Sequence, residues 1–144
     1  MSKTAFRYFD SDLEPGHVVT PHGDHLANLS ADKQKAEAAI RAGDSRGHIR
    51  GNSIFVFESR KVAEGLLGET DGKHLYEVTV DDRDILNRAD LRIYDEIVQA
   101  LKYGRDARPL VKEFWDGVER SCPRNEFTVS KLTVRRKLVD DEEK

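Results

Sequence analysis

Residues 51–68, GNSIFVFESRKVAEGLLG, restrict the fold more than any other part of the chain. The apolar run at residues 54–57 contains β-branched and aromatic side chains, which are typical of a buried strand. It is followed by apolar residues at helical spacing, namely Val62, Ala63, Leu66 and Leu67. The segment therefore predicts a strand that passes through a tight turn directly into a helix.

Ser59 lies at the junction of this predicted strand and helix. A serine there can cap the helix, because its hydroxyl accepts a hydrogen bond from an N–H group two or three residues later. Gly68 would then follow the last turn as a helix-terminating glycine. Capping explains Ser59 fully, although polar residues between a strand and a helix also often belong to ligand sites.

Composition favours one globular domain in a reducing compartment. A chain of 144 residues, with 38% hydrophobic and 35% charged residues, can bury one sizeable core. The 24 basic and 27 acidic residues are well mixed, so no overall field attracts nucleic acid or a membrane. Cys122 is the sole cysteine, which excludes an internal disulfide, and no apolar run approaches about 18 residues. We therefore expect a cytoplasmic protein without a membrane span.

The remaining patterns predict an α+β domain with a mixed or antiparallel split sheet. A half-exposed strand is indicated at residues 74–80, where hydrophobic residues alternate with others. Further strands are predicted at residues 5–9, 17–20 and 126–138, the last with a bulge or bend near Lys131. Helices are predicted at residues 30–42, 91–101 and 110–118. We expect residues 1–138 to form the domain and residues 139–144 to form a flexible acidic tail.

Standard catalytic motifs are missing from the sequence. It contains no GxSxG, GxxxxGK[ST] or GxGxxG pattern. His22, Asp24 and His25 share a loop, but their spacing matches no familiar metal site, so no metal is expected. The glycine-containing loop at residues 43–51 is basic, and we expect it to be solvated, with phosphate binding as the alternative.

Two charged residues stand out because they lie in otherwise apolar predicted strands. Arg7 is inside AFRYF, and Glu126 opens EFTV. A charged side chain buried without a partner is costly, so both either face water on an open sheet face or share a cleft. Both alternatives are open on the residues alone.

The order of Arg7, Ser59 and Glu126 resembles the Arg-Ser-Glu pattern of NAD-dependent ADP-ribosyltransferases. The opening AFRYFDSDLEPGHVV is similar to the start of the small bacterial rifamycin-modifying branch, with Arg7 at the position of that branch's histidine. IFVFES followed by VAEGL resembles the strand and helix that hold the nicotinamide ribose in the family. The resemblance implies an ADP-ribosyltransferase-like fold and NAD as co-substrate.

The resemblance also implies roles for particular residues. Glu126 would stabilise the positive charge that develops on the ribose as nicotinamide leaves, and Ser59 would orient the ribose or that carboxylate. Arg7 would hold the pyrophosphate or a ribose hydroxyl. The nicotinamide ring would pack against Tyr8, Phe55 or Phe57.

Departures from the family pattern leave the acid and the acceptor open. Arg124 and Asn125 precede Glu126, so the double-acid motif of the arginine-modifying branch is absent. In the antibiotic-modifying branch the acid lies earlier, which makes Asp82 or Asp84 the alternative to Glu126. The acceptor is a protein side chain, a nucleic acid, an antibiotic or water, and the biological role is that of a toxin, of a phage-conflict protein or of a resistance enzyme.

Two other functions remain as alternatives. NAD hydrolysis or transfer of an RNA phosphate onto NAD would keep the fold and change the chemistry. A non-catalytic module that binds nucleic acid or protein would instead require a local basic face. The residues proposed for that face are Arg46, His48, Arg50, Arg135 and Arg136.

Overall fold

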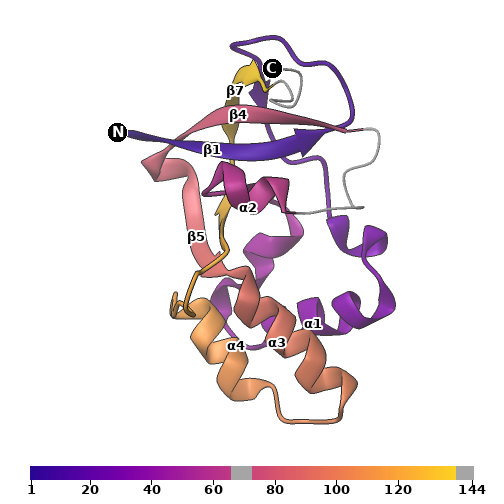
Figure 1. The fold of residues 1–144 in the computed structure, drawn as a ribbon. Helices are drawn as coiled ribbons and strands as arrows, with labels where there is room; N and C mark the ends of the chain where they lie inside the picture. Colours follow the sequence, from indigo (N-terminus) through magenta and orange to yellow (C-terminus); the bar gives the residue numbers. More distant parts are fainter. Residues whose placement is uncertain (66–72, 139–144) are drawn as a thin grey trace.

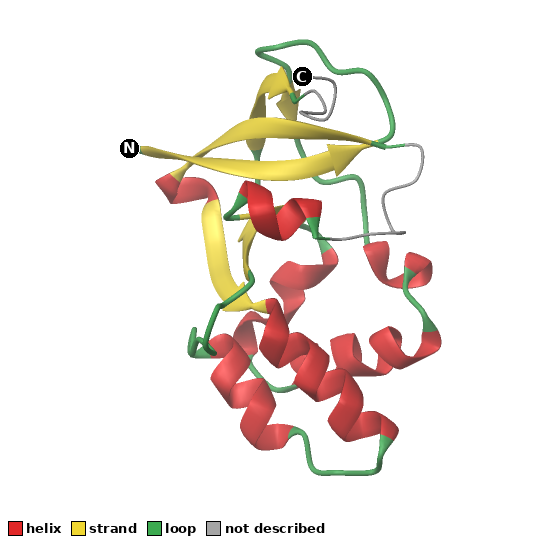
Figure 2. Cartoon of the chain, viewed as in Figure 1, coloured by secondary structure: helices red, strands yellow, loops and turns green. Residues whose placement is uncertain are grey.

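Antiparallel strands form one sheet in the computed structural model, which describes residues 1–65 and 73–138 (Figures 1 and 2). The order across the sheet is β2-β7-β4-β1-β3-β6-β5. The strands are β1 (Ser2–Phe9), β2 (Val18–Val19), β3 (Ile54–Phe57), β4 (His74–Asp81), β5 (Ile85–Asp90), β6 (Asn125–Val129) and β7 (Leu132–Lys137). The α-helices are α1 (Ala31–Ala42), α2 (Arg60–Glu64), α3 (Leu91–Lys102) and α4 (Arg108–Trp115), and the 3-10 helices are η1 (His25–Asn28), η2 (Ser45–Gly51) and η3 (Asp82–Asp84).

The sheet is weakest between β1 and β3. β1 pairs with β4 along its whole length, from Ser2 opposite Asp81 to Phe9 opposite His74. Against β3, in contrast, its register contains the single pair Phe6–Phe57. This single pair joins one half-sheet, β2-β7-β4-β1, to the other, β3-β6-β5, and Figure 1 shows β1 and β4 running across the direction of β5. We call this place the β1–β3 joint.

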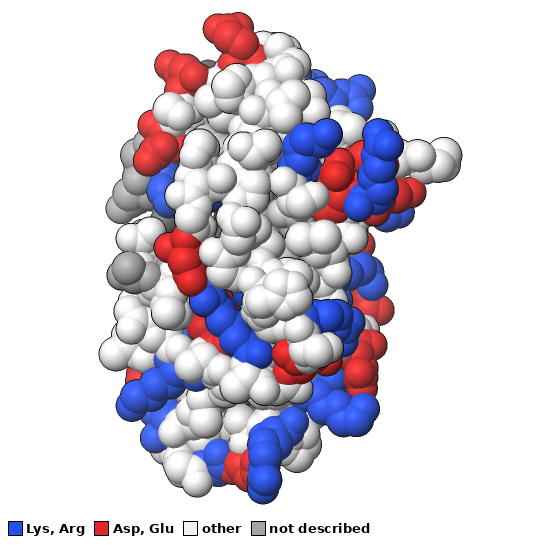
Figure 3. Space-filling view, turned by 180° about the vertical axis from the view of Figure 1, so that it is seen from behind, with Lys and Arg blue, Asp and Glu red and all other residues white. Residues whose placement is uncertain are grey.

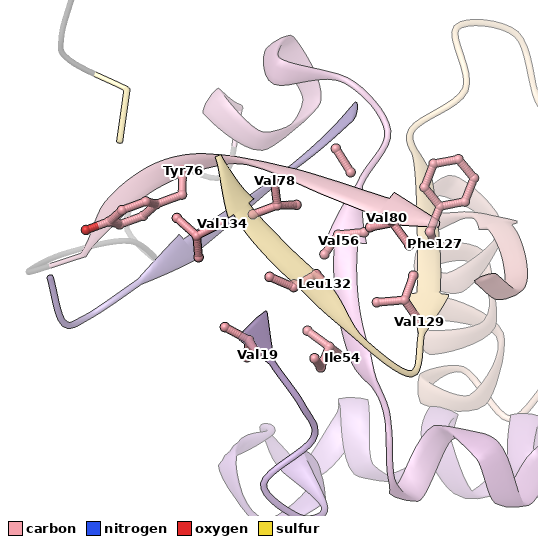
Figure 4. Close-up of a cluster of buried hydrophobic side chains, with 11 residues drawn as sticks. Val19, Ile54, Val56, Tyr76, Val78, Val80, Phe127, Val129, Leu132 and Val134 are labelled. Carbon is pink, nitrogen blue, oxygen red and sulfur yellow. The ribbon is translucent and has the colours of Figure 1, made fainter. Parts of the chain in front are cut away.

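The main hydrophobic core lies between the two half-sheets. Side chains from both halves point towards one another, among them Val56 of β3, Val78 of β4 and Val134 of β7 (Figure 4). All three are at most 1% exposed. At the β1–β3 joint, backbone pairing contributes little. Burial of this apolar surface is therefore what holds the two half-sheets together.

A second core joins the longer helices beside the sheet (Figure 2). Ile40 of α1, Ile97 of α3 and Phe114 of α4 are fully buried in it. Trp115 donates its indole N–H to the Ile40 oxygen at 2.8 Å, so this buried polar group has a partner. Ala89 of β5 also belongs to this cluster, which fixes the helices against the β3-β6-β5 half.

Most of the predicted elements are present. Ser59 caps α2 by accepting from Val62 N, and the long strand at residues 126–138 is two strands, β6 and β7, that meet near Lys131. Leu66, Leu67 and Gly68 lie outside the described residues, as does the tail at residues 139–144.

One strand was missed, and two expectations from the sequence need correction. The strand β5 was not predicted, because ILNRAD has little apolar alternation. β4 is buried on both sides rather than half-exposed, since even Glu77 is covered and pairs with Arg135 and Arg136. The basic loop at residues 43–51 is mostly the 3-10 helix η2.

None of the helices in the described parts of the chain has the length and apolar character that a membrane crossing requires.

Candidate functional site

Arg7 lies at the β1–β3 joint. Strand alternation places its side chain on the face opposite to Phe6, and Nη1 donates a hydrogen bond of 2.7 Å to the main-chain oxygen of Phe55. Its Nε is buried and has no hydrogen-bond partner. Burial lowers the pKa of Arg7, whereas the negative charges of Glu126 and Asp10 raise it, and burial has the larger effect. The guanidinium nevertheless remains a cation. The joint therefore holds a guanidinium whose donors are not all used.

A cavity of about 500 Å³ opens beside this guanidinium. Arg7, Phe9 and Phe55 form its sheet side, and the segments around residues 10–13 and 17–24 form its other walls. The volume is within the range that small ligands and cofactors occupy in proteins.

Hydrogen bonds connect the loops that form the cavity walls to the rest of the fold. The Tyr76 hydroxyl accepts from Leu13 N at 3.1 Å and donates to the Ser11 oxygen at 3.3 Å. Asp24 accepts two hydrogen bonds from Arg41, at 2.7 and 2.9 Å. These contacts give the cavity a preformed shape.

Glu126 lies two strands away from Arg7 on β6. It is half-buried, and its register partners are Phe57 on β3 and Ala89 on β5. Its negative charge raises the pKa of Arg7 against the larger effect of burial. Register partners share a sheet face, so Glu126 lies on the face of Phe6, opposite to Arg7, and the described lining of the cavity does not include it. Its charge acts on the guanidinium across the β1–β3 joint.

The other residues expected at the site are distributed around the joint. Phe55 lines the Arg7 cavity, whereas Phe57 lies between Phe6 and Glu126 in the sheet. Ser59 is two residues beyond Phe57, and its oxygen is used as the cap of α2.

Tyr8 faces a different hollow. It lines a space of about 350 Å³ together with Arg60 and Glu64 of α2 and His74 of β4. Burial and the charge of Glu64 raise the pKa of Tyr8. The structure therefore separates Tyr8 from Arg7 and Phe55.

Asp82 and Asp84, the alternative acids, lie at the far end of β1. Ser2 pairs with Asp81, so Arg7 is five residues, or about 17 Å, further along the strand. Asp82 pairs with Lys3, and Asp84 accepts a hydrogen bond from Ser130. Of the acids that the sequence suggested, Glu126 is the one near Arg7.

Sequence reasoning missed a buried polar cluster behind Phe55. Arg50 is 3% exposed and binds the fully buried Glu37 through Nε at 3.0 Å and Nη2 at 2.5 Å. Tyr94 donates to Glu37 at 3.3 Å. One weak signal was available, because Glu37 falls between Ala36 and Ile40 on the inner face of α1.

The basic residues proposed for an interaction face do not gather on one surface. Arg50 is buried, and Arg46 pairs with Asp44 beside Trp115. Arg135 and Arg136 pair with Glu77 in the sheet instead. The face of the molecule in Figure 3 shows basic and acidic side chains next to one another rather than a basic patch.

The arrangement suits an uncharged or anionic polar ligand more than a metal ion. Within residues 1–65 and 73–138, no three His, Cys, Asp or Glu side chains are grouped so that they could hold a metal. A guanidinium with spare donors favours oxygen acceptors such as phosphate or hydroxyl groups, and a nearby carboxylate favours developing positive charge.

A scan against family models found no match for the chain, and neither did a search of curated proteins.

Proposed function

We propose that this protein transfers ADP-ribose from NAD to an acceptor, with release of nicotinamide. The observation that carries the proposal is the position of Arg7 at the β1–β3 joint, beside a cavity and within electrostatic reach of Glu126. Arg7 and Glu126 belong to β1 and β6, and Ser59 lies two residues after β3, the strand between them. We also propose that the fold is ADP-ribosyltransferase-like, with its sheet divided at this joint.

Each residue has a specific role in the proposed reaction. The glycosidic bond between the ribose C1′ and nicotinamide breaks, the bonding electrons leave with the nicotinamide, and C1′ acquires oxocarbenium character. Glu126 stabilises that charge and accepts a hydrogen bond from a ribose hydroxyl. An acceptor oxygen or nitrogen then bonds to C1′ and releases its proton to water.

Arg7 and Phe55 form the binding part of the site. The guanidinium of Arg7, which lines the cavity, holds the pyrophosphate or a ribose hydroxyl, a task that suits a planar set of donors. Phe55 forms a wall of the cavity next to them. Ser59 lies at the start of α2, where its hydroxyl hydrogen can point towards the ribose while its oxygen caps the helix.

The direct test is calorimetric titration with NAD, combined with chromatographic detection of nicotinamide. We expect the wild type to bind NAD and release nicotinamide, and Arg7→Ala to lose at least tenfold in affinity. Glu126→Gln keeps the shape of the side chain, so it should bind NAD and release nicotinamide at least a hundredfold more slowly.

Two matched variants control for general effects. Arg108→Ala removes an arginine that is highly exposed and paired with Asp106, and Glu113→Gln changes a carboxylate of α4. Both should behave as the wild type does. If the wild type shows no heat of binding and releases no nicotinamide at millimolar NAD, the proposal is refuted. If nicotinamide is released and free ADP-ribose is the product, the acceptor is water.

A further inference from the structure

We propose that Arg50 is a positioning residue of this site, which holds Phe55 and, through Phe55, the guanidinium of Arg7. The inference extends the proposed function, because it assigns a role in the same site to a residue outside the Arg-Ser-Glu set. It rests on a continuous series of contacts from Glu37 of α1 to Arg7 of β1.

The series begins with an ion pair that fixes the plane of the Arg50 guanidinium. Arg50 donates to both carboxylate oxygens of Glu37, and Glu37 also accepts from Arg41 Nε at 3.2 Å. A guanidinium bound at two of its nitrogens has little freedom to rotate. Arg50 is therefore a rigid platform rather than a mobile side chain.

Phe55 packs on this platform. The Arg50 Cζ lies 4.7 Å from the centre of the Phe55 ring, an arrangement in which the cation attracts the aromatic face. Phe114 and Tyr94 surround the same guanidinium, at 5.2 and 5.9 Å. The ring of Phe55 is thus held by Arg50, while its main-chain oxygen accepts the hydrogen bond from Arg7.

Arg50 also contributes charge at the site. Burial opposes ionisation of Arg50, but the hydrogen bonds to Glu37 and the charges of Glu37 and Glu126 raise its pKa overall. Arg50 is thus a permanent cation within electrostatic reach of Glu126. Both arginines contact Phe55: Arg7 binds its main-chain oxygen, and Arg50 stacks on its ring.

A purely structural role explains Arg50 poorly. Its Nη1 is buried without a hydrogen-bond partner, and a buried ion pair is often no more stable than two well-packed apolar residues. Arg50 is therefore expected to serve the site more than the stability of the fold.

The test replaces the ion pair by apolar residues of similar size, in the double variant Glu37→Leu/Arg50→Met. The readout is the Nε–H signal of Arg7 in ¹⁵N NMR spectra, identified by its loss in Arg7→Lys. We expect the double variant to fold, its Arg7 signal to move, and the exchange of that proton with water to accelerate at least tenfold. Nicotinamide release from NAD should fall at least tenfold in the same variant.

The control is Glu96→Leu/Arg120→Met, which removes another doubly hydrogen-bonded ion pair, one that joins α3 to the segment between α4 and β6. It should leave the Arg7 signal and nicotinamide release within twofold of the wild type. If the first double variant does not fold, Arg50→Lys provides the same readout, because lysine keeps the charge and loses the planar group that stacks on Phe55.

The outcomes separate this inference from the proposed function. If the Arg7 signal keeps its position and its exchange rate in a folded variant, the role of Arg50 is overturned, whether or not the protein releases nicotinamide from NAD. If the signal responds but the wild type releases no nicotinamide, Arg50 positions Arg7 as inferred and the proposed reaction is wrong.

Discussion

Arg7 Nη1 donates a hydrogen bond of 2.7 Å to the main-chain oxygen of Phe55, next to the one residue pair in the register of β1 and β3. A side chain thus makes a connection where strand pairing ends. The same side chain has a buried Nε without a partner, so its placement is only partly favourable for the folded state. Arg7 therefore stabilises the fold less than a fully paired arginine would.

Replacing Arg7 by leucine should therefore separate binding from stability. The variant loses the hydrogen bond to Phe55 and also the cost of burying a guanidinium, so we expect its free energy of unfolding to stay within about 1 kcal/mol of the wild type. Affinity for NAD should fall at least tenfold. Urea denaturation and calorimetry measure the two effects, and a loss of several kcal/mol in stability would show that Arg7 is mainly structural.

The contact between η2 and the end of α1 predicts a strong effect of Gly47→Ala. A methyl group on Gly47 would lie 1.8 Å from the main-chain oxygen of Arg41, so the backbone of η2 would have to move. We expect a loss of about 3 kcal/mol in urea denaturation. Gly65→Ala is the control, because its nearest neighbour is at 3.4 Å and its φ is −75°, and it should change stability by no more than about 1 kcal/mol. Equal stability of the two variants would contradict the observed packing of η2.

Local sequence signals were sufficient to predict most of the secondary structure. β3 and the Ser59 cap follow from a short apolar run and a preferred capping residue, both of which act within a few residues. β5 was missed because its stability comes from pairing with β6, where Arg88 lies opposite Phe127 and Ala89 opposite Glu126. Such pairing is a tertiary property that ILNRAD does not reveal by itself.

The site was predictable only in part, for a similar reason. The exceptional positions of Arg7 and Glu126 were visible, because charged residues in apolar strands require an explanation. The Glu37–Arg50 pair joins residues 13 positions apart in segments that each read as ordinary surface. Its burial depends on the packing of α1, η2 and the helical core, which no local pattern encodes.

Trp115 provides a test of that helical core. Trp115→Phe removes the buried hydrogen bond to Ile40 and part of the packing against Phe114, whose ring lies 5.6 Å away in an edge-to-face arrangement. We expect the variant to lose about 2 kcal/mol, measured by circular dichroism in urea since the chain has a single tryptophan. Tyr103→Phe, at a side chain that is 64% exposed, should have no measurable effect. A neutral Trp115→Phe would mean that the indole N–H contributes nothing.

Asp90 connects the start of α3 with the segment that leads into β6. One carboxylate oxygen accepts from the main-chain N–H groups of Arg92 and Arg124, each at 2.9 Å, and the other accepts from Arg120 N at 2.8 Å. Asp90→Asn replaces one acceptor by an NH₂ group that faces an N–H, so we expect a loss of about 2 kcal/mol at pH 7. Asp32→Asn, on the exposed first turn of α1, is the matched control.

The effect of Asp90→Asn should depend on pH in a defined direction. Burial tends to raise the pKa of Asp90, but the three N–H groups outweigh it and hold the pKa below the ordinary value of about 3.9. A lowered folded-state pKa means that the carboxylate stabilises the fold fully above about pH 4, and that this stabilisation is lost as the pH falls through the folded-state value. The difference in unfolding free energy between wild type and Asp90→Asn should therefore be constant from pH 7 to pH 5 and shrink below pH 4. A difference that stays the same down to pH 2 would show that the charge of Asp90 does not contribute and that the variant acts through packing alone.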